Sequence, residues 1–241
     1  MRPIPLLSVT VLAVLATGCG SASIAGHGSP APSPTPSSNG VAVLPAAEIL
    51  AKAKTAFQNA DTVHIKGSVL DAGKHLGLDI RIKGAAGGRG TLTIEGQTLE
   101  ILRIGQKGYL KGDEAFWRGQ TGNAEAGKLL KGKYLAFPTT HPEFKDLASF
   151  TDMQAIGGQL AEATKVKKGS RKTIRGIQAI GLVESGADGS ILYVALQGKP
   201  YPLRSVPNEG GSVDYLDYGK PVTLTTPPAE LVIDISKLGG H

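Results

Sequence analysis

The sequence predicts an α+β fold: a strongly curved antiparallel sheet, a half-barrel of about ten strands, covered by about three helices. Three observations predict it. Apolar and polar residues alternate with a period of two along most of the chain after Thr62, which is typical of strands with one wet face. One amphipathic helix precedes these strands, and a central segment lacks the alternation. The 33 glycines and 15 prolines among 241 residues indicate many turns and disfavour a helical bundle.

The amphipathic helix is expected over Ala46–Ala60. Its apolar side chains recur at three- and four-residue spacing, so they share one helix face. These side chains are Ile49, Ala53, Ala56, Phe57 and Ala60.

The first strands are expected to form a meander. Alternating apolar residues mark the segments 63–69, 76–82 and 91–94. Turn residues separate them at 71–73, 84–90 and 95–97, so neighbouring strands should pair antiparallel. Further strands are expected at 99–104, 107–111 and 115–118.

The middle of the chain is expected to be helical and to lead into a second meander. One helix is predicted at Ala124–Leu130 and another from Glu143 to Ile156, the second because it follows Pro142 and spaces Phe144, Leu147 and Phe150 by threes. Alternation then predicts strands at 163–168, 172–184, 191–196, 203–206, 213–218 and 222–225.

Composition excludes several classes of protein. With 41% hydrophobic and 19% charged residues, the chain as a whole is not intrinsically disordered. A single cysteine cannot build a disulfide framework or a cysteine-rich zinc site. Aromatic residues make up 5% of the chain, which leaves little to stack on nucleic-acid bases, so no nucleic-acid partner is expected.

The N-terminus has the pattern of a secretory signal. Arg2 precedes an apolar run over 6–16 that is too short to span a bilayer as a helix, and small residues lead directly into Cys19. This arrangement resembles the lipobox of bacterial lipoproteins, although Ala16 stands where Leu is usual. The resemblance implies cleavage after residue 18 and a diacylglyceryl and palmitate lipid on Cys19. The alternative is an ordinary signal peptide followed by an incidental cysteine.

A tether is expected between this cysteine and the folded part. Residues 19–45 are dominated by Ser, Ala, Gly and Pro, a composition that cannot bury enough apolar surface to fold and that proline keeps extended. The domains predicted are therefore a signal peptide over 1–18, a lipidated tether over 19–45 and one folded domain over 46–238. Loss of residues 1–18 removes Arg2 alone among the charges, so the net charge falls from +6 to +5.

The chain resembles the LppX/LprG group of actinobacterial lipoproteins, which are relatives of the lipoprotein carrier LolA. The resemblance lies in the order of its parts: lipidated cysteine, tether, helix, meander, helical insert and second meander. Four phrases carry the likeness, which covers about residues 46–238. They are Ala60–Gly67, Ile174–Ile180, Leu192–Arg204 and Pro227–Ile235. The resemblance implies a bent sheet closed by helices over an apolar cavity, and a protein that binds or transfers lipids.

The residues also allow this cavity to be argued physically. A curved apolar face covered by few helices can be underfilled, and unfilled apolar volume stays dry and accepts a hydrocarbon guest. The alternative, that the same residues form an ordinary packed core, stays open at this point. The candidate lining residues are Leu76, Leu78, Ile80, Ile82, Leu92, Ile94, Leu99, Ile101, Ile180, Leu182, Leu192 and Val194, with Phe144, Leu147, Phe150, Met153 and Ile156 as a lid.

A run of basic residues is the candidate contact with anionic lipid headgroups. Its members are Lys165, Lys167, Lys168, Arg171, Lys172 and Arg175. The alternative is a solvated turn between two strands.

Catalytic and metal-binding patterns are not found. The five histidines are scattered, the glycine-rich stretch 84–90 leads into a strand rather than a phosphate-binding helix, and no Gly-x-Ser-x-Gly elbow occurs. Asp214 and Asp217 should lie on opposite faces of one strand and so not form a carboxylate pair. No catalytic residue, metal or cofactor is therefore expected.

The function predicted is that of a monomeric surface lipoprotein, anchored on the extracytoplasmic face of the bacterial cell membrane, that binds or carries the acyl chains of a lipid or glycolipid without catalysis. A membrane export protein is the partner considered for such a carrier. The alternative is an envelope sensor or regulatory lipoprotein that binds a membrane protein.

Overall fold

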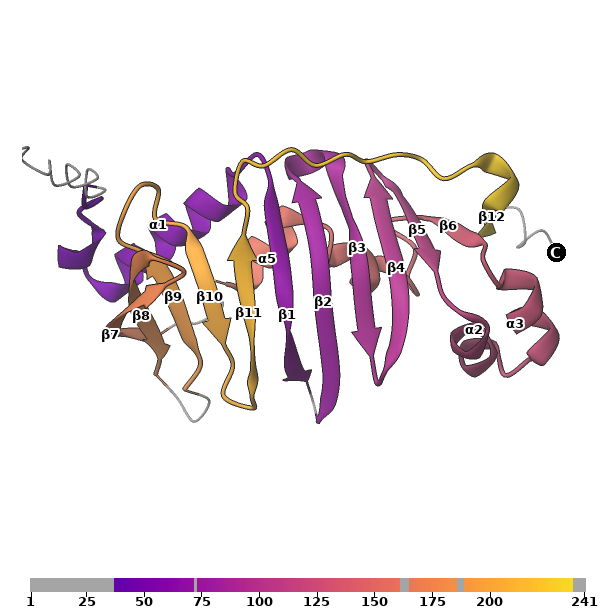
Figure 1. The fold of residues 1–241 in the computed structure, drawn as a ribbon, viewed down its shortest axis with the longest axis horizontal. Coiled ribbons are helices and arrows are strands. Elements are labelled where there is room, and N and C mark those ends of the chain that lie inside the picture. Colours follow the sequence, from indigo (N-terminus) through magenta and orange to yellow (C-terminus); the bar gives the residue numbers. More distant parts are fainter. Residues whose placement is uncertain (1–36, 72, 161–164, 186–188, 236–241) are drawn as a thin grey trace, which may run out of the picture. The chain divides into compact units, whose positions relative to one another are not determined.

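The computed structural model describes residues 37–71, 73–160, 165–185 and 189–235. Within these ranges the chain forms one large sheet with helices packed on one of its faces (Figure 1). The helices are α1 (Ala46–Gln58), α2 (Glu114–Thr121), α3 (Ala124–Leu130), α4 (Lys145–Ser149) and α5 (Met153–Gln159), with short 3-10 turns η1 (Val41–Val43), η2 (Gly84–Ala86) and η3 (Ala229–Leu231). This is the α+β class that the sequence predicted.

The sheet has 12 strands in the described part of the chain, and most of them are hairpin neighbours. They are β1 (Val63–Asp71), β2 (Lys74–Lys83), β3 (Gly87–Ile94), β4 (Gln97–Ile104), β5 (Lys107–Lys111), β6 (Tyr134–Pro138), β7 (Val166–Ile174), β8 (Ile177–Glu184), β9 (Ile191–Ala195), β10 (Pro202–Val206), β11 (Gly211–Leu216) and β12 (Val232–Asp234).

The strand order joins two meanders at their first and last strands. It runs β12-β6-β5-β4-β3-β2-β1-β11-β10-β9-β8-β7, so β1 pairs with β11 in the middle of the sheet. The pairs are antiparallel except that β12 runs parallel to β6, which corrects the expectation of a wholly antiparallel sheet. The sheet is open, since β12 and β7 are its two edges. Residues 217–228 follow β11 and cross the sheet along its strand ends to reach β12 (Figure 1).

The two faces of the sheet follow from the alternation along each strand. On β1, Val63 and Ile65 are buried beneath the helices, and the register places Ile65 beside Ile80 of β2. We call this helix-covered surface the inner face and the opposite surface the outer face. The inner face packs against Phe57 of α1, Met153 of α5 and other apolar side chains to form the main core.

The strand and helix numbers differ from the predicted ten and three because several short segments were assigned wrongly. Residues 115–118, predicted as a strand, lie in α2. The carboxylate of Asp113 accepts a hydrogen bond from the backbone N–H of Phe116 at 2.7 Å and caps this helix. An N-terminal cap of this kind outweighs an alternation of only four residues. Strands β6 and β12 were not predicted, and residues 222–225, predicted as a strand, have no regular structure.

The predicted helix over 143–156 is two helices. Its chain turns at Thr151, and the side chain of Asp152 then accepts hydrogen bonds from the N–H groups of Gln154 and Ala155, which starts α5. Apolar spacing by threes is preserved across the break, so periodicity alone does not reveal it. The result is a bent helical pair lying against the inner face.

The glycine-rich stretch 84–90 is a shorter loop than expected, because β3 already begins at Gly87. Gly90 lies within the strand, where a side-chain Cβ would come within 2.1 Å of the backbone oxygen of Asp79. A glycine is therefore needed there for the close approach of β2 and β3.

The folded domain begins before residue 46. In the last part of the predicted tether, the N–H of Asn39 donates to the backbone oxygen of Leu196 at 3.0 Å, and Val41 is buried against α1 and β8. Residues 1–18 and Cys19 lie outside the described residues, as does most of the predicted tether.

Candidate functional site

The predicted lining residues all come from the inner face or from the helices that cover it. Their environments differ along that face, however. In its centre Ile80, Ile82 and Leu92 are at most 1% exposed and pack directly against the helices. Leu76, Leu78 and Ile94, nearer the other end of the same strands, are only half-buried. The centre is thus a filled core, and open space lies to either side of it.

The larger space, the α2–α4 cavity, lies between β3–β6 and the helices α2, α3 and α4. Its volume is ≈ 550 Å³. Apolar side chains dominate its lining, with Gln120, Thr121 and Glu143 contributing the polar groups. The apolar lining comprises Ile94, Leu99, Leu110, Phe116, Trp117, Leu130, Leu135, Phe144 and Leu147.

The second space, the α1–α5 cavity, lies at the other end of the inner face, between α1, α5 and β8–β11. It measures ≈ 410 Å³. Leu182, Leu192 and Ile156, which the sequence placed in the lining or lid, border it together with Leu50, Leu160 and Tyr215. Burial raises the pKa of the Tyr215 phenol. Glu184 is the acidic residue among the lining groups of this cavity.

The helical pair α4–α5 covers the centre between the two cavities and is fixed to the sheet by Arg103. This arginine of β4 is 7% exposed and points to the inner face. Its guanidinium donates to the Thr151 backbone oxygen at 2.7 Å and to the Thr151 hydroxyl at 3.2 Å, and its Nη2 lies 3.6 Å from a carboxylate oxygen of Asp152. Arg103 therefore holds the joint between α4 and α5 in place.

The same helical pair is also attached to α1. Gln58 and Gln154 each donate a side-chain N–H to the other's backbone oxygen, at 3.3 and 3.2 Å. Gly157 lies against Gln58, and a Cβ on it would come within 2.4 Å of the Gln58 Cγ. The helical cover is thus joined to both the sheet and α1, which gives the two cavities a fixed common wall.

Two buried nitrogen atoms near the α2–α4 cavity lack a hydrogen-bond partner among the described residues. They are Trp117 Nε1 and His141 Nδ1. Trp117 lines the cavity, and the His141 ring packs against Phe144, another lining residue, with ring centroids 5.3 Å apart. An unsatisfied buried donor is costly, so these two groups are candidates for polar recognition.

Most of the predicted basic residues lie on a strand rather than in a turn. Lys165 directly precedes β7, which is an edge of the sheet, four of the others lie on β7, and Arg175 lies in the tight turn that follows it. Lys168 donates to the Ala42 backbone oxygen at 3.0 Å, and Lys172 lies over the Tyr193 ring on the outer face. Arg175 is a structural residue, because its guanidinium binds Asp214 at 2.6 Å and two backbone oxygens. Charged edge strands also discourage unwanted strand pairing.

The prediction that Asp214 and Asp217 lie on opposite faces of one strand was wrong. Strand β11 ends at Leu216, and Asp217 adopts a left-handed conformation with φ 51°, so its side chain turns to the outer face, where it meets His64 at 3.3 Å. Asp214 lies on the same face and binds Arg204 and Arg175. The two carboxylates have separate partners, and no contact between them is formed. The described residues hold no group of three or more histidine, cysteine or acidic side chains that could bind a metal.

Sequence reasoning missed a part of the α2–α4 cavity. Phe116 and Trp117 were assigned to a strand, while Leu110, Leu135 and Leu130 were not singled out. The signal that could have found them is the Asp113 cap, which begins a helix directly before two large aromatic residues.

No described helix is both long enough and apolar enough to cross a membrane. A scan against models of protein families gives no match, and a search of curated proteins gives none either.

Solved structures do resemble this chain. LprF from Mycobacterium bovis aligns with a TM-score of 0.52 and 14% identity over 76% of this chain and 96% of LprF. The lipoprotein LppX from Mycobacterium tuberculosis aligns with a TM-score of 0.46 and 12% identity over 75% of this chain and 98% of LppX. A Pseudomonas aeruginosa MucA/MucB complex gives a TM-score of 0.37 and 15% identity, over 77% of this chain and 59% of the matched one. The likeness to LprF shows that this chain shares the fold of that protein, which confirms the fold resemblance predicted from the sequence.

Proposed function

We propose that this protein is a cell-envelope lipoprotein that holds the acyl chains of a lipid or glycolipid in the cavities of its inner face, without catalysing a reaction. The α2–α4 cavity is the observation that carries this proposal. Its volume of ≈ 550 Å³ falls within the roughly 300–1,000 Å³ typical of small-molecule sites, and nine of the lining residues are apolar.

The energetics favour a hydrocarbon guest. Burial of an acyl chain contributes roughly 0.8 kcal/mol per methylene group, so about ten buried methylenes would contribute ~8 kcal/mol before the costs of association. An apolar cavity of this kind has few groups that could hold ordered water. Trp117 Nε1 and His141 Nδ1 lie beside the cavity and could pair with an ester or hydroxyl oxygen of the same ligand.

Anchoring completes the proposal. The apolar run before Cys19 supports cleavage and lipidation at that residue, and the following segment of Ser, Ala, Gly and Pro supports a spacer between the membrane and the domain. The protein would then act at the extracytoplasmic face of the membrane, where a membrane export protein could supply its ligand.

The proposal is tested by native mass spectrometry and organic extraction of the full protein purified from its own host's membranes. A matched pair of variants makes the test specific. Leu130 is half-buried and lines the α2–α4 cavity, whereas its neighbour Leu129 is 69% exposed on the same helix. We expect Leu130→Glu to lose the copurified lipid and Leu129→Glu to keep it, since only the first places a carboxylate among the apolar lining residues.

Two results would contradict the proposal. One is wild-type protein that carries no lipid under native conditions and takes up none from mixed membrane lipids. The other is equal lipid occupancy in the two variants when circular dichroism shows both to be folded. If the lipid-free protein instead captured a membrane signalling protein, the sensor function would replace the carrier function.

A further inference from the structure

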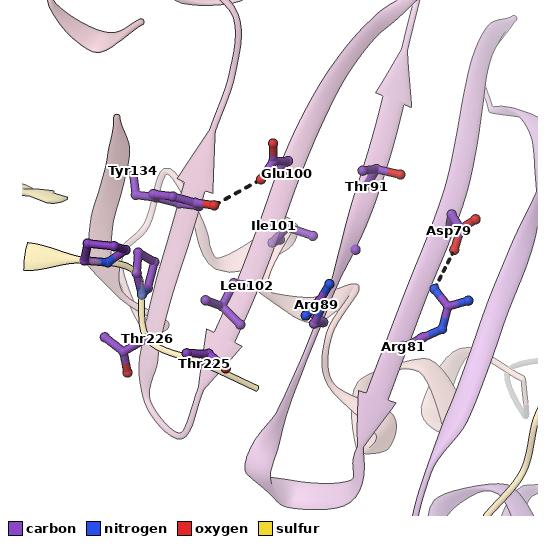
Figure 2. A pocket seen from close by; sticks show the side chains of 13 residues that line it. Asp79, Arg81, Arg89, Thr91, Glu100, Ile101, Leu102, Tyr134, Thr225 and Thr226 are labelled. Atoms are coloured by element: carbon purple, nitrogen blue, oxygen red, sulfur yellow. Dashed lines mark hydrogen bonds and ion pairs between the residues drawn. The ribbon is translucent and has the colours of Figure 1, made fainter. Parts of the chain in front are cut away.

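A further pocket lies on the outer face of the sheet, away from the two cavities. Figure 2 shows its floor, formed by β2, β3 and β4, and its wall, formed by the segment 225–228 that crosses towards β12. Its volume is ≈ 560 Å³. Unlike the α2–α4 cavity, it is lined mainly by residues with charged or hydroxyl-bearing side chains, so it suits a different class of ligand.

Two arginines stand directly opposite each other in this pocket. The register of β2 and β3 pairs Arg81 with Arg89. Facing side chains on neighbouring antiparallel strands have Cβ atoms about 4.5–5.5 Å apart, and like charges in this position repel. An anion between them would convert this repulsion into attraction. Guanidinium groups suit phosphate in particular, because each can donate two parallel hydrogen bonds to its oxygens.

The carboxylates of the pocket already have cationic partners, one of which is Arg81 through a single nitrogen. Asp79 accepts from His64 at 2.7 Å, Lys66 at 2.8 Å and Arg81 at 3.3 Å. Glu100 accepts from Lys111 at 2.8 Å and from the Tyr134 hydroxyl at 3.1 Å.

Arg89, in contrast, makes no hydrogen bond or ion pair with any residue of the described ranges, and it is exposed. It is therefore a cation with free donors at the floor of a pocket whose acids are occupied. Figure 2 shows its guanidinium between the Leu102 side chain and Arg81.

Three threonines also line the pocket. Thr91 lies two residues from Arg89 on the same face of β3, and Thr225 and Thr226 extend from the crossing segment. We infer that the outer pocket binds a phosphorylated polyol, with its phosphate held by Arg89 and Arg81 and its hydroxyls held by these threonines. The phosphate could belong to a soluble polyol phosphate or to a lipid headgroup, and binding measurements separate the two sources. The inference does not depend on the proposed function, because the lipid cavities lie on the opposite face.

The test is isothermal titration calorimetry of the full protein with four probes. They are myo-inositol 1-phosphate, dibutanoyl phosphatidylinositol, inorganic phosphate and myo-inositol. We expect at least one of the first two to bind about tenfold more tightly than phosphate or inositol alone, because only they engage both the arginines and the threonines. Tighter binding of the short-chain lipid would identify a headgroup site, and tighter binding of inositol phosphate a soluble ligand.

Charge-matched variants assign the site. Arg89→Gln should weaken binding at least about tenfold, since it removes charge-assisted hydrogen bonds. Arg118→Gln removes the same charge from an exposed position on α2 and should change affinity by less than about twofold once salt screens distant charges. The inference is overturned if neither phosphorylated probe binds better than phosphate and inositol. It is also overturned if folded Arg89→Gln protein binds as tightly as the wild type.

Discussion

The two faces of the sheet are built from the same strands but are stabilised differently. On the inner face, apolar side chains such as Ile80 and Leu92 are fully buried beneath the helices. On the outer face, residues that alternate with the apolar ones along the strands form ion pairs, for example Asp79 with Lys66 and Asp214 with Arg204. Burial of apolar area supplies most of the stability of a fold, whereas ion pairs near solvent contribute little. The inner face should therefore determine stability, and the outer face its dependence on pH and salt.

The inner face is itself divided. Its centre is filled, and cavities of ≈ 550 and ≈ 410 Å³ lie at its two ends. A side chain beside a cavity has fewer neighbours than one in the filled centre, so its removal sacrifices fewer contacts. Matched substitutions on neighbouring strands can measure this difference directly.

The largest effect is expected in the filled centre. Ile80 of β2 is 1% exposed, and Ile80→Ala would leave a void that the surrounding strands and helices cannot close. We expect a loss of about 2–5 kcal/mol in the free energy of unfolding. Urea denaturation followed by circular dichroism measures it. A loss below about 1 kcal/mol would mean that the centre is not packed as the structure shows.

Arg103 is a buried charged residue on the inner face, and its loss should have the next largest effect. Arg103→Met keeps the length of the side chain but leaves the buried Thr151 oxygen without its donor. We expect a loss of about 2–3 kcal/mol.

Hydrogen exchange can show where this stability is lost. If Arg103 fixes the joint of α4 and α5, amide exchange in α5 should accelerate more than exchange in β4. Arg118→Met, at an exposed position, serves as the control and should cost under about 0.5 kcal/mol. Uniform acceleration across the sheet would argue against a local anchoring role.

The next prediction concerns the border of the larger cavity. Ile94 of β3 lies on the inner face like Ile80, but it is half-buried and lines the α2–α4 cavity. Ile94→Ala should cost only about 1–2 kcal/mol, because part of its surface faces open space rather than packed atoms. The same urea experiment compares it with Ile80→Ala. Equal losses at the two positions would show that the cavity is filled or collapsed in solution.

The difference between centre and ends could not be predicted from the sequence. Alternation correctly assigned Ile80, Ile94 and Leu99 to one face, because the period of a strand is fixed by its backbone. Which of them borders a cavity depends on where the helices lie, and that is decided by contacts distant in sequence. Arg103, which holds the helical pair on the sheet, is one such contact, 48 residues from Thr151.

Helix capping explains a second feature that the sequence pattern did not predict, the helix α2. Ala115–Arg118 alternates like a short strand, yet Asp113 caps a helix over it and places Trp117 in the cavity wall. Likewise, the parallel pairing of β12 with β6 depends on a segment that runs from β11, in the middle of the sheet, to the edge, and no local pattern specifies such a pairing.

The smallest effect is expected on the outer face, in acid. The Arg204 guanidinium, with Arg175 beside it, holds the pKa of Asp214 below its ordinary value. The folded protein thus binds a proton at this carboxylate less readily than the unfolded chain does. This contribution to stability is fully present above the unfolded pKa of about 4 and is lost as pH falls through the folded pKa.

Asp214→Asn isolates this contribution. The variant should lose a few tenths to about 1 kcal/mol at pH 7, because the pair is partly exposed and solvent screens it. As pH falls below about 4 and through the lower folded pKa, the difference from the wild type should shrink, since the folded wild type then loses the charge as well. Ile80→Ala should show the same loss at both pH values, because apolar burial does not titrate. If Asp214→Asn were instead as costly in acid as at neutral pH, Asp214 would stabilise the fold by packing rather than by its charge. The outer face would then not be stabilised by electrostatics at this residue.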